Sequence, residues 1–298
     1  YVGKNCRVHS ITDFKDSPIF EAATAYPMIF VAQRTKQRAN PVYTEARVPS
    51  GEGLDVAAVI KTQGRPLADD ALSGKDWSFA DQAACRQIEK MQRSGVPLEQ
   101  YVEGRIYRGI LTGLNEAFVI DSETRQQLIE EDPSSKDLIK PLLMGRDIKR
   151  WSISGDGRWM IVTPIGVKIK EYPAIFDHLK EWKAALQVRQ DQGNHWWELR
   201  ACAYYSEFEK PKIVFPDIAP RARFALDLDA HYLGNTGYII PVQDLYLLGV
   251  LNSEAVNEFY VNLSSQVRGD YLRFIYQYVA QIPIPDAPKA EKRAIENL

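Results

Sequence analysis

The segment at residues 107–120, YRGILTGLNEAFVI, constrains the fold more than any other stretch of this sequence. Gly109 and Gly113 bracket a short apolar piece, a polar turn follows at Asn115 and Glu116, and residues 118–120 have the composition of a buried strand. Glycine adopts backbone conformations that other residues resist, so the pair predicts a tight loop between two strands. Taken alone, the segment predicts an ordinary hairpin.

Length and composition indicate a globular protein. The 298 residues can bury one large core or two modest ones, and 45% hydrophobic with 26% charged residues is ordinary for a soluble chain. No apolar run is long enough to span a bilayer, and the first residues carry no secretion signal. We therefore expect a cytoplasmic protein without a membrane partner.

The three cysteines, Cys6, Cys85 and Cys202, are odd in number and far apart. This spacing indicates neither a disulfide framework nor a cysteine metal site. The four histidines, among them His178, show no helical pairing of the kind that holds zinc, and we predict that His178 is a partly buried helix residue.

Charge is unevenly distributed. The net charge of −2 argues against nonspecific, charge-driven binding of nucleic acid. Residues 140–223, however, contain fifteen Lys or Arg against ten Asp or Glu, a local balance of 15 − 10 = +5. Such a region can line a cleft that faces phosphates, although random variation in surface charge also produces an excess of this size.

Four segments in a fixed order carry a resemblance to a known family. They are GILTGLNEAFVI at 109–120, KPLLMGRDIKRW at 140–151, EKPKIVFPDI at 209–218, and YLLGVLNS at 246–253 followed by QIPIP at 281–285. Together they resemble the TaqI-like C-terminal specificity domain, the target-recognition domain behind adenine-specific DNA methyltransferases and fused type IIG restriction-modification enzymes. The resemblance covers roughly the last two thirds of the chain.

A second resemblance lies near the N-terminus. Residues 13–34, DFKDSPIFEAATAYPMIFVAQR, look like the last strands of an N6-adenine methyltransferase catalytic domain, with a strong buried strand at 25–33. The two resemblances together imply a catalytic remnant at 1–50, a linker with one helix at 51–98, and the DNA target-recognition domain at 99–298. The chain would then be a C-terminal fragment, with no cofactor of its own and S-adenosylmethionine bound by the parent protein.

The residues that perform methyl transfer would lie upstream. No glycine-rich methyl-donor loop occurs here, and the Asn-Pro-Pro motif that grips a flipped adenine has only a near match at Asn40, Pro41, Val42 and Tyr43. Val42 replaces the second proline, and the tetrapeptide follows the polar run RTKQRA. We interpret it as a loop and give the catalytic interpretation less weight.

Patterns and caps predict the remaining elements. Ser78, with Asp81 three residues on, predicts a helix that Gly95 and Pro97 end, and Pro173 starts a helix at its favoured first position. The other expected elements are a strand at 56–60, helices at 122–129 and from Ser134 to the Gly145 turn, strands at 212–217, 224–229 and 238–242, helices at 245–251 and 253–263, a segment led by Asp270, and a proline-rich strand before a helix near Lys289. The expected class is mixed α/β (α+β), a target-recognition domain with a twisted mixed sheet and packed helices.

The run GRDIKRW at 145–151 is the first candidate for DNA contact. Arg146, Lys149, Arg150 and Trp151 place three cations and one aromatic beside a glycine turn, which suits phosphate contact and the reading of base edges. The forked guanidinium of arginine can bind guanine with two hydrogen bonds, so Arg146 and Arg150 are the first choices. The alternative is that these are solvated charges beside a core tryptophan.

Asp147, Ile148 and Lys149 also match the tail of a common nuclease pattern, in which acidic groups hold a metal. Metal-dependent cleavage needs a further acidic ligand on an adjoining strand. Nothing upstream supplies it convincingly, so we reject a nuclease site and predict no metal.

Further candidates lie in loops. The crowded run NHWWELR offers Asn194, which can pair with adenine, and Trp196, which can stack on bases, although core packing of at least one tryptophan is favoured. The residues that we predict to contact DNA are Thr112, Asn115, Arg146, Lys149, Arg150, Asn194, Trp196, Arg221, Arg223 and Asn235. No catalytic residue is predicted.

The leading hypothesis is therefore a module that recognises a specific double-stranded DNA site for the upstream methyltransferase domain of the same polypeptide. Two alternatives stay open. One is a fragment with residual nuclease or methyltransferase activity, and the other is a protein-protein docking module that uses the aromatic-rich helices at 245–280. Exposed aromatics there would favour docking, and buried ones would favour a scaffold.

Overall fold

The computed structural model describes residues 2–15, 17, 19, 27–35, 40–47, 55–67, 71–72, 77, 79, 82–264, 266–267 and 271–297. The chain forms two compact units, Tyr1–Lys90 and Met91–Leu298, which are described separately. Ser78, Asp81 and Asp270, which the sequence offered as helix caps or leads, lie outside the described residues. Within the described ranges, no helix has the length and apolar character that crossing a membrane requires.

The first unit is a small sheet with a helix. Its elements are α1 (Val2–Asn5), β1 (Cys6–Asp13), β2 (Met28–Arg34), β3 (Val42–Glu45), α2 (Val56–Gln63) and β4 (Arg65–Pro66). The sheet order is β2-β1-β3-β4, with β1 antiparallel to β2 and parallel to β3. The strand predicted at 56–60 is wrong: these residues begin α2, because the Asp55 side chain accepts a hydrogen bond from Ala58 N at 3.0 Å and caps the helix.

Two further expectations for this unit need correction. The strand predicted at 25–33 exists as β2, but its side chains are exposed rather than buried, and the strand lies at the edge of the described sheet. Val42 and Tyr43 begin strand β3 and are not loop. Tyr43 is buried, stacks on Phe79 with ring centroids 5.0 Å apart, and donates to Asp13 at 2.9 Å. Its ring is therefore unavailable to stack on a flipped base.

The second unit holds more elements, most of them short. Helix α3 (Gln82–Ser94) leads into it, and its strands are β5 (Gly95–Pro97), β6 (Tyr107–Arg108), β7 (Val119–Ile120), β8 (Ile139–Leu143), β9 (Trp159–Ile161), β10 (Lys212–Pro216), β11 (Ile218–Ala219), β12 (Ala225–Asp227), β13 (Tyr232–Leu233), β14 (Gly237–Ile240), β15 (Gln266–Val267), β16 (Tyr271–Arg273) and β17 (Pro283–Pro285). Its helices are α4 (Leu98–Tyr101), α5 (Asn115–Phe118), α6 (Ser122–Glu131), α7 (Pro173–Glu181), α8 (Lys183–Val188), α9 (Leu245–Leu251), α10 (Glu254–Leu263), α11 (Tyr276–Val279) and α12 (Lys289–Glu296), with 3-10 turns at Pro133–Asp137, Gly145–Asp147, Ile169–Glu171 and Tyr205–Glu209.

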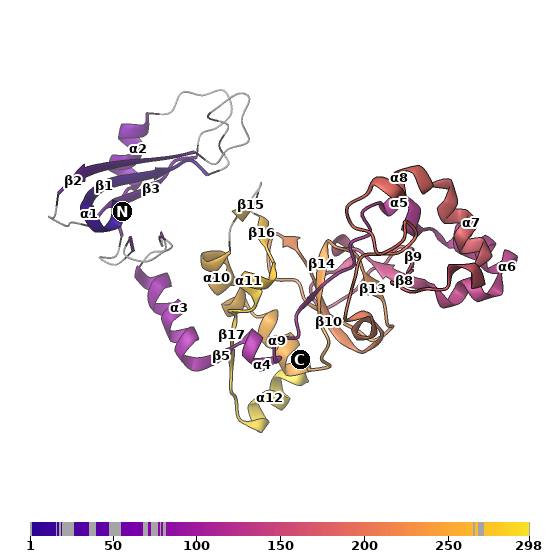
Figure 1. The fold of residues 1–298 in the computed structure, drawn as a ribbon. Coiled ribbons are helices and arrows are strands. Elements are labelled where there is room, and N and C mark those ends of the chain that lie inside the picture. The colour runs from indigo at the N-terminus through magenta and orange to yellow at the C-terminus, as the bar shows by residue number, and fades with distance from the viewer. Residues whose placement is uncertain are drawn as a thin grey trace. The chain divides into compact units, whose positions relative to one another are not determined.

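A central sheet of order β12-β10-β14-β6 separates two cores. Successive side chains of a strand point to opposite faces, so Val214 of β10 enters one core while Ile213 and Phe215 enter the other. Figure 1 shows helices α5 to α8 gathered at one end of this unit and α9 to α12 at the other. The continuous apolar run IVFP that follows Lys212 in β10 is expected for a strand buried on both faces.

The sheet of order β13-β8-β9-β7 supports the core that Val214 enters. Strand β8 pairs in parallel with β13 and antiparallel with β9. Its residues were predicted as a helix running from Ser134 to the Gly145 turn, which is wrong. Asp132, not Ser134, caps a 3-10 turn that ends at Asp137, and the following IKPLL extends as a strand because Pro141 cannot donate within a helix.

The segment at 107–120 is not a hairpin. Strand β6 pairs with β14 and strand β7 pairs with β9, so the loop connects two different sheets, and Asn115 with Glu116 forms part of helix α5. Gly113 has φ +71°, a conformation that glycine adopts readily. A Cβ on Gly109 would lie 2.0 Å from the carbonyl oxygen of Gly234, so Gly109 permits the close approach of two loops.

Many other predicted elements are confirmed, as is the mixed α/β class. Helix α6 begins at Ser122, α3 ends at Ser94, α9 covers 245–251, and Ser253 caps α10 by accepting from Val256 N at 3.2 Å. The helix that starts at Pro173 breaks at Trp182 into α7 and α8. His178 is a partly buried helix residue, as expected. Four aromatics at 245–280 are buried, which favours the scaffold interpretation, namely Tyr246, Phe259, Tyr260 and Phe274, whereas Tyr271 and Tyr276 are 43% and 38% exposed.

Candidate nucleic-acid interface

Residues 145–152, which we term the basic turn, connect β8 toward β9 and carry Arg146, Lys149 and Arg150 on their exposed side. Ile148 and Ile153 form an isolated antiparallel bridge, and Lys149 N donates to Ser152 O at 2.9 Å. These contacts make a minimal hairpin with Arg150 and Trp151 at its tip. Trp151 is 51% exposed, so the interpretation of charges beside a core tryptophan is wrong.

Buried Asp147 braces the basic turn from below. Its carboxylate accepts from Met144 N at 2.7 Å and from Arg158 Nη2 at 2.7 and 2.9 Å. Arg146, beside it in sequence, points outward, with 73% of its side chain exposed and its closest carboxylate, Asp156, at 3.7 Å. The geometry therefore gives Asp147 a structural role and leaves Arg146 accessible to an anion.

Asn252 fixes the tip of the basic turn to helix α9. Its side chain donates to Phe224 O at 2.8 Å and accepts from Phe224 N at 3.0 Å, and Phe224 O also accepts from Trp151 N at 3.0 Å. Arg150 Nη2 donates to Asn252 O at 2.8 Å. Asn252 was not among the predicted site residues, although it belongs to the YLLGVLNS segment on which the resemblance rests.

A second loop, Gly234 to Gly237, packs against the start of the basic turn. Gly145 N donates to Thr236 Oγ1 at 2.8 Å, and a Cβ on Gly145 would lie 2.3 Å from Thr236 O. Arg108, an exposed residue of β6, donates from Nε to Asn235 O at 3.3 Å. Predicted residue Asn235 therefore lies beside a cation, Arg108, that was not among the predicted site residues.

Arg221 and Arg223 shortly precede Phe224, whose backbone bonds to Trp151 of the basic turn and to Asn252. Arg221 pairs with Glu254 at 2.5 Å, two residues after Asn252, and is partly exposed. Arg223 is partly exposed and adjacent to Phe224. Contacts through Thr236, Asn252 and Phe224 thus connect the segments that carry six of the predicted residues, namely Arg146, Lys149, Arg150, Arg221, Arg223 and Asn235.

The four other predicted residues lie around Arg189, away from that group. Arg189 is buried and donates to the backbone carbonyls of Thr112, Trp196 and Glu198. Burial lowers the pKa of Arg189 to about 10, so the guanidinium is still charged at neutral pH. Thr112 is also buried and donates to Asn115 Oδ1 at 2.7 Å. These contacts hold loops together and give Thr112 no exposed surface for DNA.

Glu198 organises the loop that carries Asn194. Its carboxylate accepts from Asn194 N at 2.7 Å, His195 N at 3.0 Å and Gly166 N at 2.8 Å. Asn194 keeps its side chain exposed. Trp196 is partly buried, with its ring 5.3 Å from that of Trp197, in agreement with the preference for core packing of at least one tryptophan in this run.

Asp217 introduces a negative charge beside the second loop and near Arg108 and Arg273. Its backbone N donates to Thr236 O at 2.9 Å, so it adjoins the second loop. Burial raises the pKa of the Asp217 carboxyl, against the opposing effect of the positive charges of Arg273 and Arg108. The charge of this surface therefore depends on pH.

Asp227, Asp229 and His231 form a cluster that could hold a metal by spacing alone. Asp227 Oδ2 lies 2.5 Å from Lys212 Nζ, and both side chains are completely buried. Its other oxygen accepts from His231 Nδ1 at 2.8 Å. Because the ammonium of Lys212 already neutralises this carboxylate, the donor set fits a structural ion pair better than a divalent ion.

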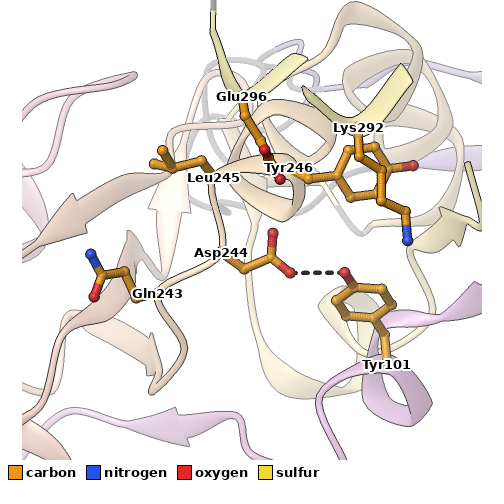
Figure 2. A pocket seen from close by; sticks show the side chains of 7 residues that line it. All are labelled: Tyr101, Gln243, Asp244, Leu245, Tyr246, Lys292 and Glu296. Atoms are coloured by element: carbon orange, nitrogen blue, oxygen red, sulfur yellow. Dashed lines mark hydrogen bonds between the residues drawn. The ribbon is translucent and has the colours of Figure 1, made fainter. Parts of the chain in front are cut away.

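A pocket of 420 Å³ lies at the start of α9, lined by Tyr101, Gln243, Asp244, Leu245, Tyr246, Lys292 and Glu296 (Figure 2). Tyr101 donates to Asp244 Oδ2 at 2.8 Å, and Asp244 Oδ1 caps α9 by accepting from Leu247 N at 2.8 Å. Lys292 of α12 lies 5.1 Å from the centre of the Tyr246 ring. The pocket joins three helices and contains none of the predicted DNA-contacting residues.

Comparison with known proteins gives a family match over the region that contains the basic turn. The TaqI-like C-terminal specificity domain matches residues 140–284. The chain is 24% identical over 318 residues to the type II methyltransferase M.BstVI of Geobacillus stearothermophilus, covering 97% of this chain and 55% of that protein. With M.PaeR7I of Pseudomonas aeruginosa the identity is 23%, over 95% of this chain and 52% of that protein. The chain thus spans about half the length of these relatives.

Among solved structures, the fold is similar to that of the type IIL restriction-modification enzyme MmeI, which was solved in complex with DNA. The TM-score is 0.64 at 13% sequence identity, and the match covers 98% of this chain and 37% of that one. This similarity establishes the mixed α/β fold.

Proposed function

We propose that this chain, whose residues 140–284 form a TaqI-like C-terminal specificity domain, recognises a specific sequence in double-stranded DNA for a methyltransferase domain of the same polypeptide. The observation that supports the proposal most directly is the basic turn. It presents Arg146, Lys149 and Arg150 on the surface, on a backbone that buried Asp147 and Asn252 hold in place. A fixed array of exposed cations suits contact with phosphates and base edges.

Lys149 and Arg150 of the basic turn have different expected roles in binding DNA. Lys149 Nζ already donates to Arg146 O at 2.7 Å, and a charged ammonium so placed suits a phosphate. Arg150 makes one hydrogen bond, to Asn252 O, and no other to the part of the chain that the structure describes. Its guanidinium is therefore oriented while further N–H groups stay available to a base edge.

The same proposal extends to the parent protein. The curated relatives are type II methyltransferases, and MmeI, with a similar fold, was solved with DNA, which supports DNA as the partner of this chain. The resemblance of residues 13–34 to an N6-adenine methyltransferase supports an adenine-specific parent, of the type IIG kind, that binds S-adenosylmethionine and acts in the cytoplasm. In this arrangement the upstream domain flips and methylates the adenine, and this chain performs no bond chemistry.

Selection from a pool of random-sequence duplexes at two salt concentrations tests the proposal. The chain should enrich one short motif. Binding should weaken steeply at the higher salt, because the protein displaces cations condensed on the DNA and their release is less favourable when the salt concentration is higher. Arg146→Ala and Arg150→Ala should weaken or blur the motif. Arg105→Ala, which removes a partly exposed arginine that pairs with Glu103 outside residues 140–223, is the matched control and should leave the motif unchanged.

Absence of any enrichment, together with no binding at low salt, would overturn the proposal for this chain. Incubation of the same DNA with the methyl donor or with a divalent metal tests the division of labour separately. Robust methylation or cleavage by this chain alone would contradict the assignment of all chemistry to the upstream domain.

A further inference from the structure

Trp151 stands out in the basic turn because its backbone is held in an unfavourable conformation. Its φ is +75°, in the left-handed region that favours glycine and that a bulky side chain rarely adopts. Such residues persist only where the surrounding structure enforces them, and they are found most often at functional sites. The strain therefore calls for a reason beyond the turn itself, since glycine would fit this position without it.

Independent contacts hold this conformation. Trp151 N donates to Phe224 O at 3.0 Å, the same carbonyl that Asn252 Nδ2 engages at 2.8 Å, and Lys149 N donates to Ser152 O at 2.9 Å across the tip. Asn252 is itself almost completely buried. The indole is thus presented from a fixed backbone.

The indole is exposed and lies beside cations. Trp151 is 51% exposed, and the Arg150 guanidinium lies 5.6 Å from its ring centre while donating to Asn252 O at 2.8 Å. Exposed Arg146 and Lys149 belong to the same turn. Protein interfaces are enriched in tryptophan and arginine but depleted in lysine, so a tryptophan on a turn with two arginines and a lysine fits a polyanion with flat bases better than a protein partner.

We propose that Trp151 is a stacking wedge, whose indole inserts against a base step of the bound duplex while the neighbouring cations neutralise the flanking phosphates. The inference rests on the proposed function, because it requires duplex DNA at the basic turn. Insertion of an apolar side chain unstacks and kinks the duplex, and pyrimidine-purine steps unstack most easily. Trp151 thereby contributes specificity through the deformability of the site, in addition to the base edges that the arginines contact.

The test uses the full chain and duplexes that carry the enriched motif with 2-aminopurine placed at each step in turn. Binding of the unaltered protein should raise the fluorescence of the probe at one step, because unstacking relieves its quenching. Trp151→Phe should keep part of the rise. Trp151→Ala and Trp151→Gly should lose it and bind roughly ten- to a hundredfold more weakly, the range expected for loss of one stacked base.

Trp151→Gly keeps the test decisive. Glycine accepts the backbone conformation of residue 151, so this variant should fold at least as well as the parent chain and any loss of binding reports the missing ring. Trp182→Ala removes another partly exposed tryptophan, 36% exposed at the junction of α7 and α8, and should change neither affinity nor fluorescence.

Two results would overturn the wedge while the proposed function stands. One is unchanged affinity and fluorescence in Trp151→Gly, and the other is binding by the unaltered protein with no change in fluorescence at any step. If the unaltered protein binds no duplex at all, the proposed function and the wedge both fail. A separately added upstream methyltransferase domain could also bind the unaltered chain but not Trp151→Gly. That result, again without DNA binding, would assign Trp151 to a protein contact instead.

Discussion

Arg158 donates from Nη2 to both carboxylate oxygens of Asp147, at 2.9 and 2.7 Å, directly beneath the basic turn. The pair is nearly buried, and its carboxylate also holds Met144 N. Arg146 lies beside the same aspartate in sequence but has its side chain in solvent. Two arginines near one carboxylate thus have different expected roles, Arg158 in folding and Arg146 in DNA binding.

Arg158→Met should destabilise the fold by about 3 kcal/mol, because it leaves the buried Asp147 carboxylate without its cationic partner. Arg146→Met is the control and should change the free energy of unfolding by less than about 0.5 kcal/mol while weakening DNA binding. Urea denaturation and duplex-binding titrations of both variants measure the two effects. Equal stability of the two variants would contradict a bracing role for Arg158.

Lys212 and Asp227 form an ion pair with both side chains fully buried. Lys212→Met should cost about 3 to 5 kcal/mol, because the carboxylate that remains is buried and unpaired. Lys210→Met removes an exposed lysine that pairs with Glu207, and it should cost about 0 to 1 kcal/mol. Urea denaturation of both variants compares the buried pair with the exposed one. A small effect of Lys212→Met would mean that Asp227 has become protonated or hydrated.

The stability that Asp227 contributes should depend on acid pH. Burial acts to raise its pKa, but hydrogen bonds from His231 and Lys212 outweigh burial and hold the pKa below its usual range. A carboxyl with a lowered folded-state pKa contributes stability above its unfolded value, about 3.9, and loses it as the pH falls through the folded-state pKa. Asp227→Asn should therefore cost much stability at neutral pH and progressively less below about pH 4. Denaturation midpoints across that range test the sign.

Sequence patterns predicted the elements that local signals determine. Ser253 and Pro173 mark helix starts through a cap and a fixed φ, and both starts are confirmed. Residues 56–60 show the limit of periodicity, because VAAVI fits a strand or a helix until the Asp55 cap decides between them. Residues 139–143 were predicted as part of a helix although Pro141 disfavours one, and no local signal shows that β13, about ninety residues later, supplies a partner strand.

The candidate site was also predictable only where local sequence signals determine it. Composition and motif select Arg146 and Arg150, since exposed cations beside a glycine turn can be recognised from the sequence. The role of Asn252 depends on two hydrogen bonds between its side chain and the backbone of Phe224, 28 residues away, and no spacing rule reveals them. Thr112 was predicted to contact DNA, yet burial removes it from the surface.

Asp217 should oppose DNA binding at neutral pH. It adjoins Thr236 of the second loop, and the charges of Arg108 and Arg273 act on it. Burial raises its pKa above the ordinary aspartate value, so the carboxyl gains a proton at a higher pH than an exposed aspartate does, and the surface becomes more positive as the pH falls toward that raised pKa. Asp217→Asn removes the charge at every pH and should strengthen duplex binding roughly two- to fivefold near neutral pH at low salt.

The variant should also flatten the pH dependence of duplex binding. Binding by the unaltered chain should strengthen as the pH falls toward the raised pKa of Asp217, whereas binding by Asp217→Asn should strengthen less over the same interval. Fluorescence anisotropy with one labelled duplex, at matched ionic strength, measures both chains. Asp229→Asn, which removes an exposed carboxylate on the loop after β12, is the charge-matched control. If Asp217→Asn and Asp229→Asn shift affinity equally, the effect reflects net charge, and the DNA does not approach the loop that Asp217 adjoins.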